Sequence, residues 1–152
     1  MIDRATMVAI CAAEGISVAA TPKVKAIAIP DPNSWNVSYT MPSGSVTLLI
    51  AFSGTYTANA NVSTRIPSLE IVDDSGNMVV LVTSSVSITA NQQRRVSFFA
   101  GATDDAGNFM GQINPLPAPM VLLPGWIVRT NVSGPDAQDR WTDCAIYGIE
   151  WS

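Results

Sequence analysis

The chain has 152 residues, of which 47% are hydrophobic and 13% are charged, whereas an ordinary soluble domain is about 25% charged. A net charge of −4 with eight scattered basic residues argues against a nucleic-acid partner, which needs clustered lysines and arginines. The absence of histidine removes the commonest general base and a common metal ligand. No apolar run reaches the roughly 18 residues of a membrane-spanning helix, so we expect no membrane partner. The surplus apolar surface is then expected to be buried within one domain or against neighbouring subunits.

Residues 1–22 lack the alternation of a strand and are predicted to form an extended N-terminal arm, although the Ala-rich stretch Ala9 to Ala13 could form a turn of helix. Asp3 beside Arg4 weakens the positive start of a signal peptide, and Glu14-Gly15 interrupt its apolar stretch, so we expect this segment to belong to the mature chain. A disordered tail is the alternative. Apolar side chains on an arm need a surface to pack on, which makes five of them candidate partner contacts: Ile2, Met7, Val8, Ile10 and Ile16.

Residues 23–152 are predicted to form a β-sandwich domain, because short segments rich in β-branched and aromatic residues alternate with turn-forming residues. In the first half, the turn from Asp73 to Asn77 carries the Asp, Ser, Gly and Asn residues that tight hairpins favour. It joins the last two of the strands expected there: residues 24–29, 35–39, 45–53, 66–72 and 78–82.

The second half continues the same pattern. Trp126 follows a Pro-Gly turn and is expected to anchor its strand in the core, and the last strand is apolar on both faces, so it is either central or covered by a partner chain. Prolines 115, 117 and 119 favour an extended connection or a sheet edge. Turn signals about every 8 to 12 residues predict an all-β sandwich or barrel of about eight or nine strands. The remaining expected elements are strands over residues 85–89, 95–100, 126–132 and 141–151 and a turn at 104–108.

Three features could carry chemistry, but each has a simpler structural explanation. The triplet Asp74-Ser75-Gly76 matches that of dimeric aspartic proteases, yet a hairpin turn requires the same residues. The acidic pairs at 73–74 and 104–105 lack the alternating spacing of a calcium loop. Cys11 and Cys144 are expected to be buried thiols, with a disulfide as the alternative. We therefore expect no catalytic residue, no metal and no cofactor.

Two further residues are candidates for partner binding. Arg65 stands among apolar residues, so it is expected to pair with a carboxylate or to face solvent; the alternative is that it anchors a contact between subunits. Trp151 closes the final strand and is the other candidate.

With the strands placed, the chain resembles the small jelly-roll virion proteins of tailed bacteriophages, a group that includes capsid decoration (cement) proteins and tail or neck accessory proteins. The residues that carry the resemblance are the run Asn61 to Leu69 with the turn after it, the run Leu123 to Thr130, and the closing Ile149-Glu150-Trp151. The distinctive part is Leu-Pro-Gly-Trp-x-x-Arg-Thr. The resemblance covers about residues 24–152 and implies a jelly-roll-like antiparallel β-sandwich with a structural role and no enzymatic activity.

The resemblance leads us to expect a capsid decoration protein that forms a homo-oligomer, with a trimer as the first guess, and clamps neighbouring capsid subunits. Its partners would be copies of itself and the major capsid protein or another virion protein. We expect it in the virion, on the capsid surface rather than the tail. The alternatives are a tail or neck accessory protein and, from a different class, a carbohydrate-binding sandwich whose four tryptophans would supply stacking rings.

Overall fold

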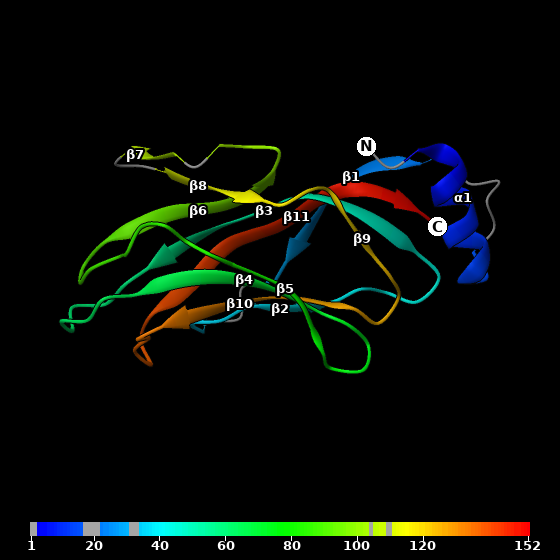
Figure 1. Cartoon of the computed structure of the whole chain (residues 1–152). Helices are drawn as coiled ribbons and strands as arrows, with labels where there is room; N and C mark the ends of the chain where they lie inside the picture. Colours follow the sequence, from blue (N-terminus) through cyan, green and yellow to red (C-terminus); the bar gives the residue numbers. More distant parts are fainter. Residues whose placement is uncertain (1–2, 17–21, 31–33, 104, 109–110) are drawn as a thin grey trace.

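The computed structural model describes residues 3–16, 22–30, 34–103, 105–108 and 111–152, and in it two β-sheets stack face to face with a helix at one end (Figure 1). This arrangement confirms the predicted all-β sandwich. The larger sheet runs in the order β1-β11-β3-β6-β8-β7, with β9 also paired to β3, and the smaller in the order β2-β10-β4-β5. The larger sheet comprises β1 (Lys23–Ile29), β3 (Val46–Thr57), β6 (Gln93–Ala100), β7 (Asp105–Asn108), β8 (Gly111–Leu116), β9 (Met120–Leu122) and β11 (Arg140–Trp151). The smaller comprises β2 (Ser38–Thr40), β4 (Ile66–Val72), β5 (Met78–Thr83) and β10 (Ile127–Ser133).

The last strand, β11, lies between β1 and β3 and pairs antiparallel with both. This confirms the central placement that the sequence left open; the pairing covers both edges of the strand, but not its outer face. Most other pairings are also antiparallel, but β6 and β8 run parallel. The predicted hairpin at Asp73 to Asn77 is confirmed as the connection between β4 and β5, where the Asp73 carboxylate accepts hydrogen bonds from the backbone of Ser75 and Asn77 at 3.0 and 2.7 Å.

Aromatic side chains fill the space between the two sheets. Trp141 of β11 is fully buried, and its ring centroid lies 6.0 Å from that of Phe52 and 5.1 Å from that of Tyr56. Trp126, the expected anchor, is only partly buried, because it lies in the turn before β10, where its backbone N–H donates to Leu123. The tryptophan that anchors the core is therefore Trp141.

The close approach of β11 to β3 depends on Gly148. A Cβ at this position would lie 2.6 Å from the backbone oxygen of Leu48. We expect Gly148→Ala to lower the free energy of unfolding by about 1–3 kcal/mol, because two backbones would have to separate. Urea denaturation measures this loss. The control is Gly111→Ala on β8, where a Cβ has nothing within 4 Å and a change below about 0.5 kcal/mol is expected; equal losses in the two variants would contradict the prediction.

The N-terminal segment differs from the extended arm that the sequence predicts. Residues Arg4–Ala13 form helix α1, which Asp3 caps by accepting a hydrogen bond from the backbone N–H of Thr6 at 2.7 Å. Met7 and Cys11 lie one turn apart on the helix and are buried against Val46 of β3. The apolar side chains thus pack on the sandwich of their own chain, and this gain favours a helix over an extended conformation.

Three other local predictions need correction. The strand expected over residues 85–89 is absent from this described segment apart from one bridge between Ile88 and Arg65, since the Ser84 hydroxyl bonds to the backbone of Val86 and bends the chain. The turn expected at 104–108 is strand β7 over Asp105–Asn108, and residue 104 lies outside the described residues. The strand expected over 35–39 is shifted and forms β2.

Candidate functional site

The outer face of the larger sheet, which points away from the smaller sheet, carries a row of apolar residues across five strands. Strand register places these residues side by side: Ala26, Tyr147, Ala51, Phe99 and Pro115. Each precedes or follows a residue that faces the core, and successive side chains of a strand point to opposite faces. Those core-facing neighbours are Ile27, Ile146, Phe52, Phe98 and Leu116. The row therefore points outward.

Exposed apolar residues in the adjacent rows extend this row into a patch. Val24 pairs with Ile149 on one side of the row, and Ile113 pairs with Ser97 on the other. Among Val24, Phe99, Ile113 and Tyr147, the exposed fraction of the residue ranges from 38% for Tyr147 to 84% for Val24. Single exposed hydrophobic residues are common, but a continuous group on a flat surface marks a site of interaction. We call this patch the apolar face; its members are Val24, Ala26, Phe99, Ile113, Pro115 and Tyr147.

A polar group borders the apolar face at one end. The Arg95 guanidinium donates from Nε to the Ser53 hydroxyl at 2.9 Å, and the Ser53 and Ser97 hydroxyls are 2.7 Å apart. Arg95 itself is exposed, and it lies on the same outward side of β6 as Ser97 and Phe99. A partner of the apolar face would therefore meet a positive charge at this border.

Helix α1 covers the opposite end of the same sheet surface. Trp151 lies on the same side of β11 as Tyr147, and it packs with Val46, Val121 and Leu123 around Met7. Figure 1 shows the helix at this end of the sandwich, beside β1 and the end of β11. The chain therefore buries one end of this sheet surface itself, while the middle of the surface stays uncovered.

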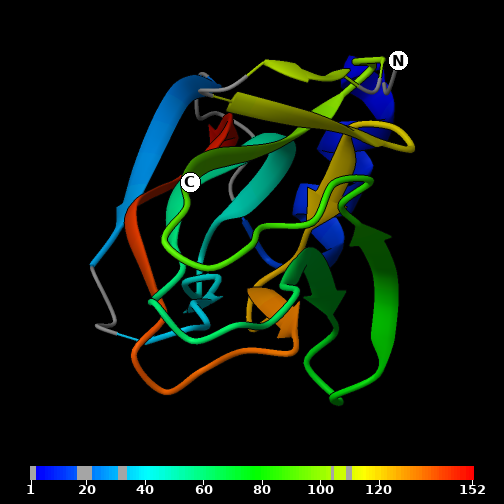
Figure 2. The ribbon, with the colours of Figure 1, turned by 90° about the vertical axis from the view of Figure 1, so that its left-hand side faces the viewer.

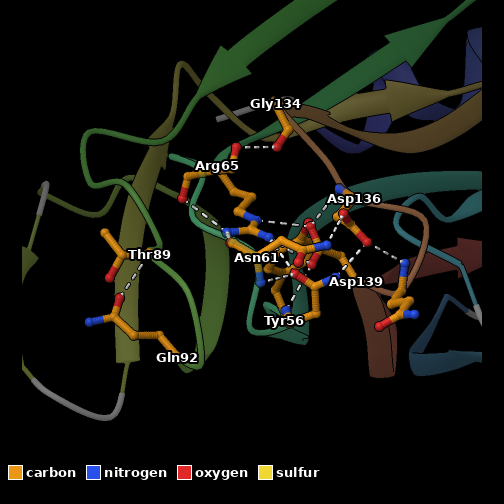
Figure 3. Close-up of polar contacts among 11 residues, drawn as sticks. Tyr56, Asn61, Arg65, Thr89, Gln92, Gly134, Asp136 and Asp139 are labelled. Atoms are coloured by element: carbon orange, nitrogen blue, oxygen red, sulfur yellow. Dashed lines mark hydrogen bonds and ion pairs between the residues drawn. The ribbon is translucent and has the colours of Figure 1, made fainter.

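The most polar buried cluster lies at the other end of the sandwich and is centred on Arg65 and Asp139, both fully buried (Figure 3). The Arg65 guanidinium donates to both Asp139 carboxylate oxygens, at 2.9 and 3.2 Å. Its other N–H groups donate to the backbone oxygens of Asn61 and Ser63 and to the side chain of Asn59. All five guanidinium N–H groups are used, so this cluster joins the 58–65 loop to the 134–139 loop.

Hydrogen bonding sets the ionisation of the cluster. Burial acts to raise the pKa of Asp139, but the hydrogen bond from Arg65 and those from the backbone of Asn59 and Asp136 hold this pKa below its ordinary value. Burial and the hydrogen bond to Asp139 raise the pKa of Tyr56 far above its ordinary range. Asp139 thus stays charged and Tyr56 neutral at neutral pH. Since every guanidinium N–H is engaged inside the protein, the cluster is structural.

The predicted partner contacts are spread over several environments. Met7 and Ile16 are buried in the core under α1, where Ile10 and Trp151 are partly buried, and Val8 is exposed on the helix. Ile2 lies outside the described residues. Arg65 pairs with a carboxylate, as the sequence favoured, and being fully buried it offers no surface to a subunit contact. Among the candidates that the structure describes, Val8 is the one that is exposed.

The described residues also bear on the chemical alternatives. Cys11 and Cys144 are both buried, as expected, and they are not joined to each other by a disulfide. In the described part of the chain, no three His, Cys, Asp or Glu side chains lie close enough to share a metal ion, and no helix is long and apolar enough to cross a bilayer. Asp74 is an exposed turn residue. Of the four tryptophans, Trp141 is buried and the others are partly buried.

Sequence reasoning missed the residues of the apolar face. Phe99 follows Phe98 and Tyr147 follows Ile146, so each strand is apolar on both faces and alternation alone cannot tell which face is the core. A signal was nevertheless present in the last strand, whose two apolar faces suggested either a central position or a covering partner. The structure gives β11 the central position and leaves its outer face partly open.

Comparisons with known proteins add little. No family model matches the chain, and no curated protein matches it. Among solved structures, infectious bursal disease virus Gx strain aligns at a TM-score of 0.36 and 12% identity over 86% of this chain and 31% of that chain. The structure of PfGH50B aligns at a TM-score of 0.35 and 13% identity over 90% of this chain and 22% of that chain. The structure of infectious bursal disease virus Gt strain aligns at a TM-score of 0.30 and 10% identity over 85% of this chain and 31% of that chain. The chain spans a third or less of each of these structures, and TM-scores this low do not establish a shared fold.

Proposed function

We propose that this protein is a non-enzymatic structural component of a bacteriophage virion, and that it attaches through its apolar face to a neighbouring virion subunit. The observation that carries the proposal is the group of exposed apolar residues on four strands of the larger sheet, β1, β6, β8 and β11. The same sheet surface is covered by α1 at one end, so the chain buries such surface where it can. The open part then requires a partner from another chain.

The capsid surface is the location that we favour. The resemblance of the Leu123 to Thr130 run to small virion proteins suggests that this protein is a virion component. The position of the exposed aromatic residues suggests how it binds its partner. Phe99 and Tyr147 lie within strands on the outer face of the larger sheet, which fits broad contact with a capsid subunit. A receptor-contact module of a tail would be expected to carry such residues at its loop tips.

The binding mode follows from the composition of the apolar face. Its centre is aromatic and aliphatic, and its border carries the positive Arg95. Interfaces of this kind gain affinity from a desolvated apolar centre and orientation from a polar rim. We expect the partner to present an apolar surface with a carboxylate placed to meet Arg95, and the contact to stabilise the shell by bridging neighbouring subunits.

The test is to mix the purified protein with shells from the same source that lack it. Binding in a fixed proportion to the capsid subunit, together with a higher melting temperature of the shells, is the expected result, measured by co-sedimentation and differential scanning calorimetry. Protein that stays in the supernatant at saturating concentration would contradict the capsid location. Binding to purified tails or necks instead would support the accessory-protein alternative.

A further inference from the structure

Strand β5 is the end strand of the smaller sheet, and its free edge differs from the other sheet edges. Proteins protect edge strands with lysines, prolines or short length, because an open edge pairs readily with another strand. β1 carries Lys23 and Lys25, β2 has three residues and is followed by Pro42, and β7 has four residues. β9 also has only three residues, and α1 packs against it through Val121.

None of these protections is present on β5. Its six residues, Met78–Thr83, include no charge and no proline. Val80 and Val82 face the core, while Met78, Val79 and Leu81 are 44–52% exposed. β4 occupies one side of the strand, and Figure 2 shows the β4–β5 hairpin at the outer margin of the sandwich. β8 of the larger sheet approaches the C-terminal end of β5, where the Gln112 side chain donates to the Ser84 hydroxyl, and the residues of β5 itself are apolar or uncharged.

We propose that β5 pairs antiparallel with β5 of a second copy of this chain, so that two four-stranded sheets become one continuous sheet. Self-pairing suits this strand because it brings no like charges together, as pairing of β1 with itself would at Lys23 and Lys25. It also sets the assembly size. A two-fold contact uses the same edge on both chains and closes a pair, whereas a trimeric ring needs two different surfaces on each chain.

The pair has a geometry that bears on the proposed function. The two-fold axis of two identical antiparallel strands stands perpendicular to their common sheet, so both larger sheets lie on the same side of it. The two apolar faces then point in the same direction and can bind two neighbouring subunits at once. Such bivalent attachment raises the effective affinity without any new contact. This last step rests on the proposed function, but the pairing of β5 does not.

Light scattering of the purified protein tests the pairing. We expect the mass of two chains of 16.1 kDa each, and the mass of one chain for Leu81→Lys and for Leu81→Glu, because each places like charges close together across the two-fold axis. A mixture of the two variants should return to the two-chain mass, which shows that both are folded. Val62→Lys, in a loop and 99% exposed, is the control and should keep the two-chain mass.

Several results would overturn the pairing: a wild-type mass of one or three chains, an unchanged two-chain mass in Leu81→Lys, or a mixture of variants that stays at one chain. These outcomes are independent of the shell experiment. A two-chain protein that ignores shells would contradict the proposed function and leave the pairing intact. A single-chain protein that binds shells would contradict the pairing and support the proposed function.

Discussion

Replacing Arg65 with methionine is expected to lower the free energy of unfolding by about 3–5 kcal/mol, because it leaves the Asp139 carboxylate buried without its counter-ion. The loss is larger than for an ordinary ion pair, since both side chains are fully buried and water cannot replace the lost hydrogen bonds. For a domain of 152 residues this corresponds to a fall in Tm of roughly 6 to 20 °C. Thermal unfolding followed by circular dichroism measures the change.

The matched control is Arg140→Met. Arg140 follows Asp139 directly but is exposed, so the same change of side chain should alter the free energy of unfolding by about 0.5 kcal/mol or less. A loss in Arg65→Met no greater than that in the control would mean that the buried pair does not hold the two loops. Shell binding per folded molecule should be unchanged in Arg65→Met, since the cluster lies away from the apolar face.

The second large effect is expected on binding. Phe99→Glu combined with Tyr147→Glu should weaken attachment to the partner at least about 30-fold, which corresponds to the loss of one interface hot spot or more. Both side chains are exposed in the free protein, so the change places carboxylates at the centre of the proposed contact without disturbing the core. Titration of labelled protein against shells measures the affinity.

Val62→Glu is the control for this experiment, because Val62 is a fully exposed loop residue outside the apolar face. It adds a negative charge without removing apolar surface from the contact, and its affinity should match that of the wild type. Unchanged binding by the double variant, with an unfolding midpoint close to that of the wild type, would show that the partner binds elsewhere. Equal weakening in the control would indicate a general effect of charge.

Local patterns predicted the strands whose two faces differ. β10 alternates strictly, with Val128, Thr130 and Val132 buried and the residues between them more exposed, as expected from its sequence. The turn at Asp73 to Asn77 was predictable because its side chains satisfy its own backbone. Helix α1 was not predicted over its full length, because ten residues with only two buried side chains give a weak pattern.

The candidate site could not be predicted to the same degree. Arg65 and Asp139 are 74 residues apart, and nothing local to either residue identifies its partner. The apolar face depends on which side of five strands faces the core, and this is settled only when the two sheets pack. The sequence did predict surplus apolar residues that need a covering partner, but it assigned them to the N-terminal segment and not to the middle of the larger sheet.

The central position of β11 has a consequence for synthesis. β1 and β3 leave the ribosome long before the strand that separates them in the finished sheet, so both expose open edges until residues 140–151 emerge. Contacts between distant segments slow folding, and unpaired edges promote aggregation in the meantime. The larger sheet closes when its last strand inserts between two strands that are already present. A chain cut short within β11 would therefore leave β1 without its only sheet partner and open an edge of β3 in the middle of the larger sheet, instead of losing one edge strand.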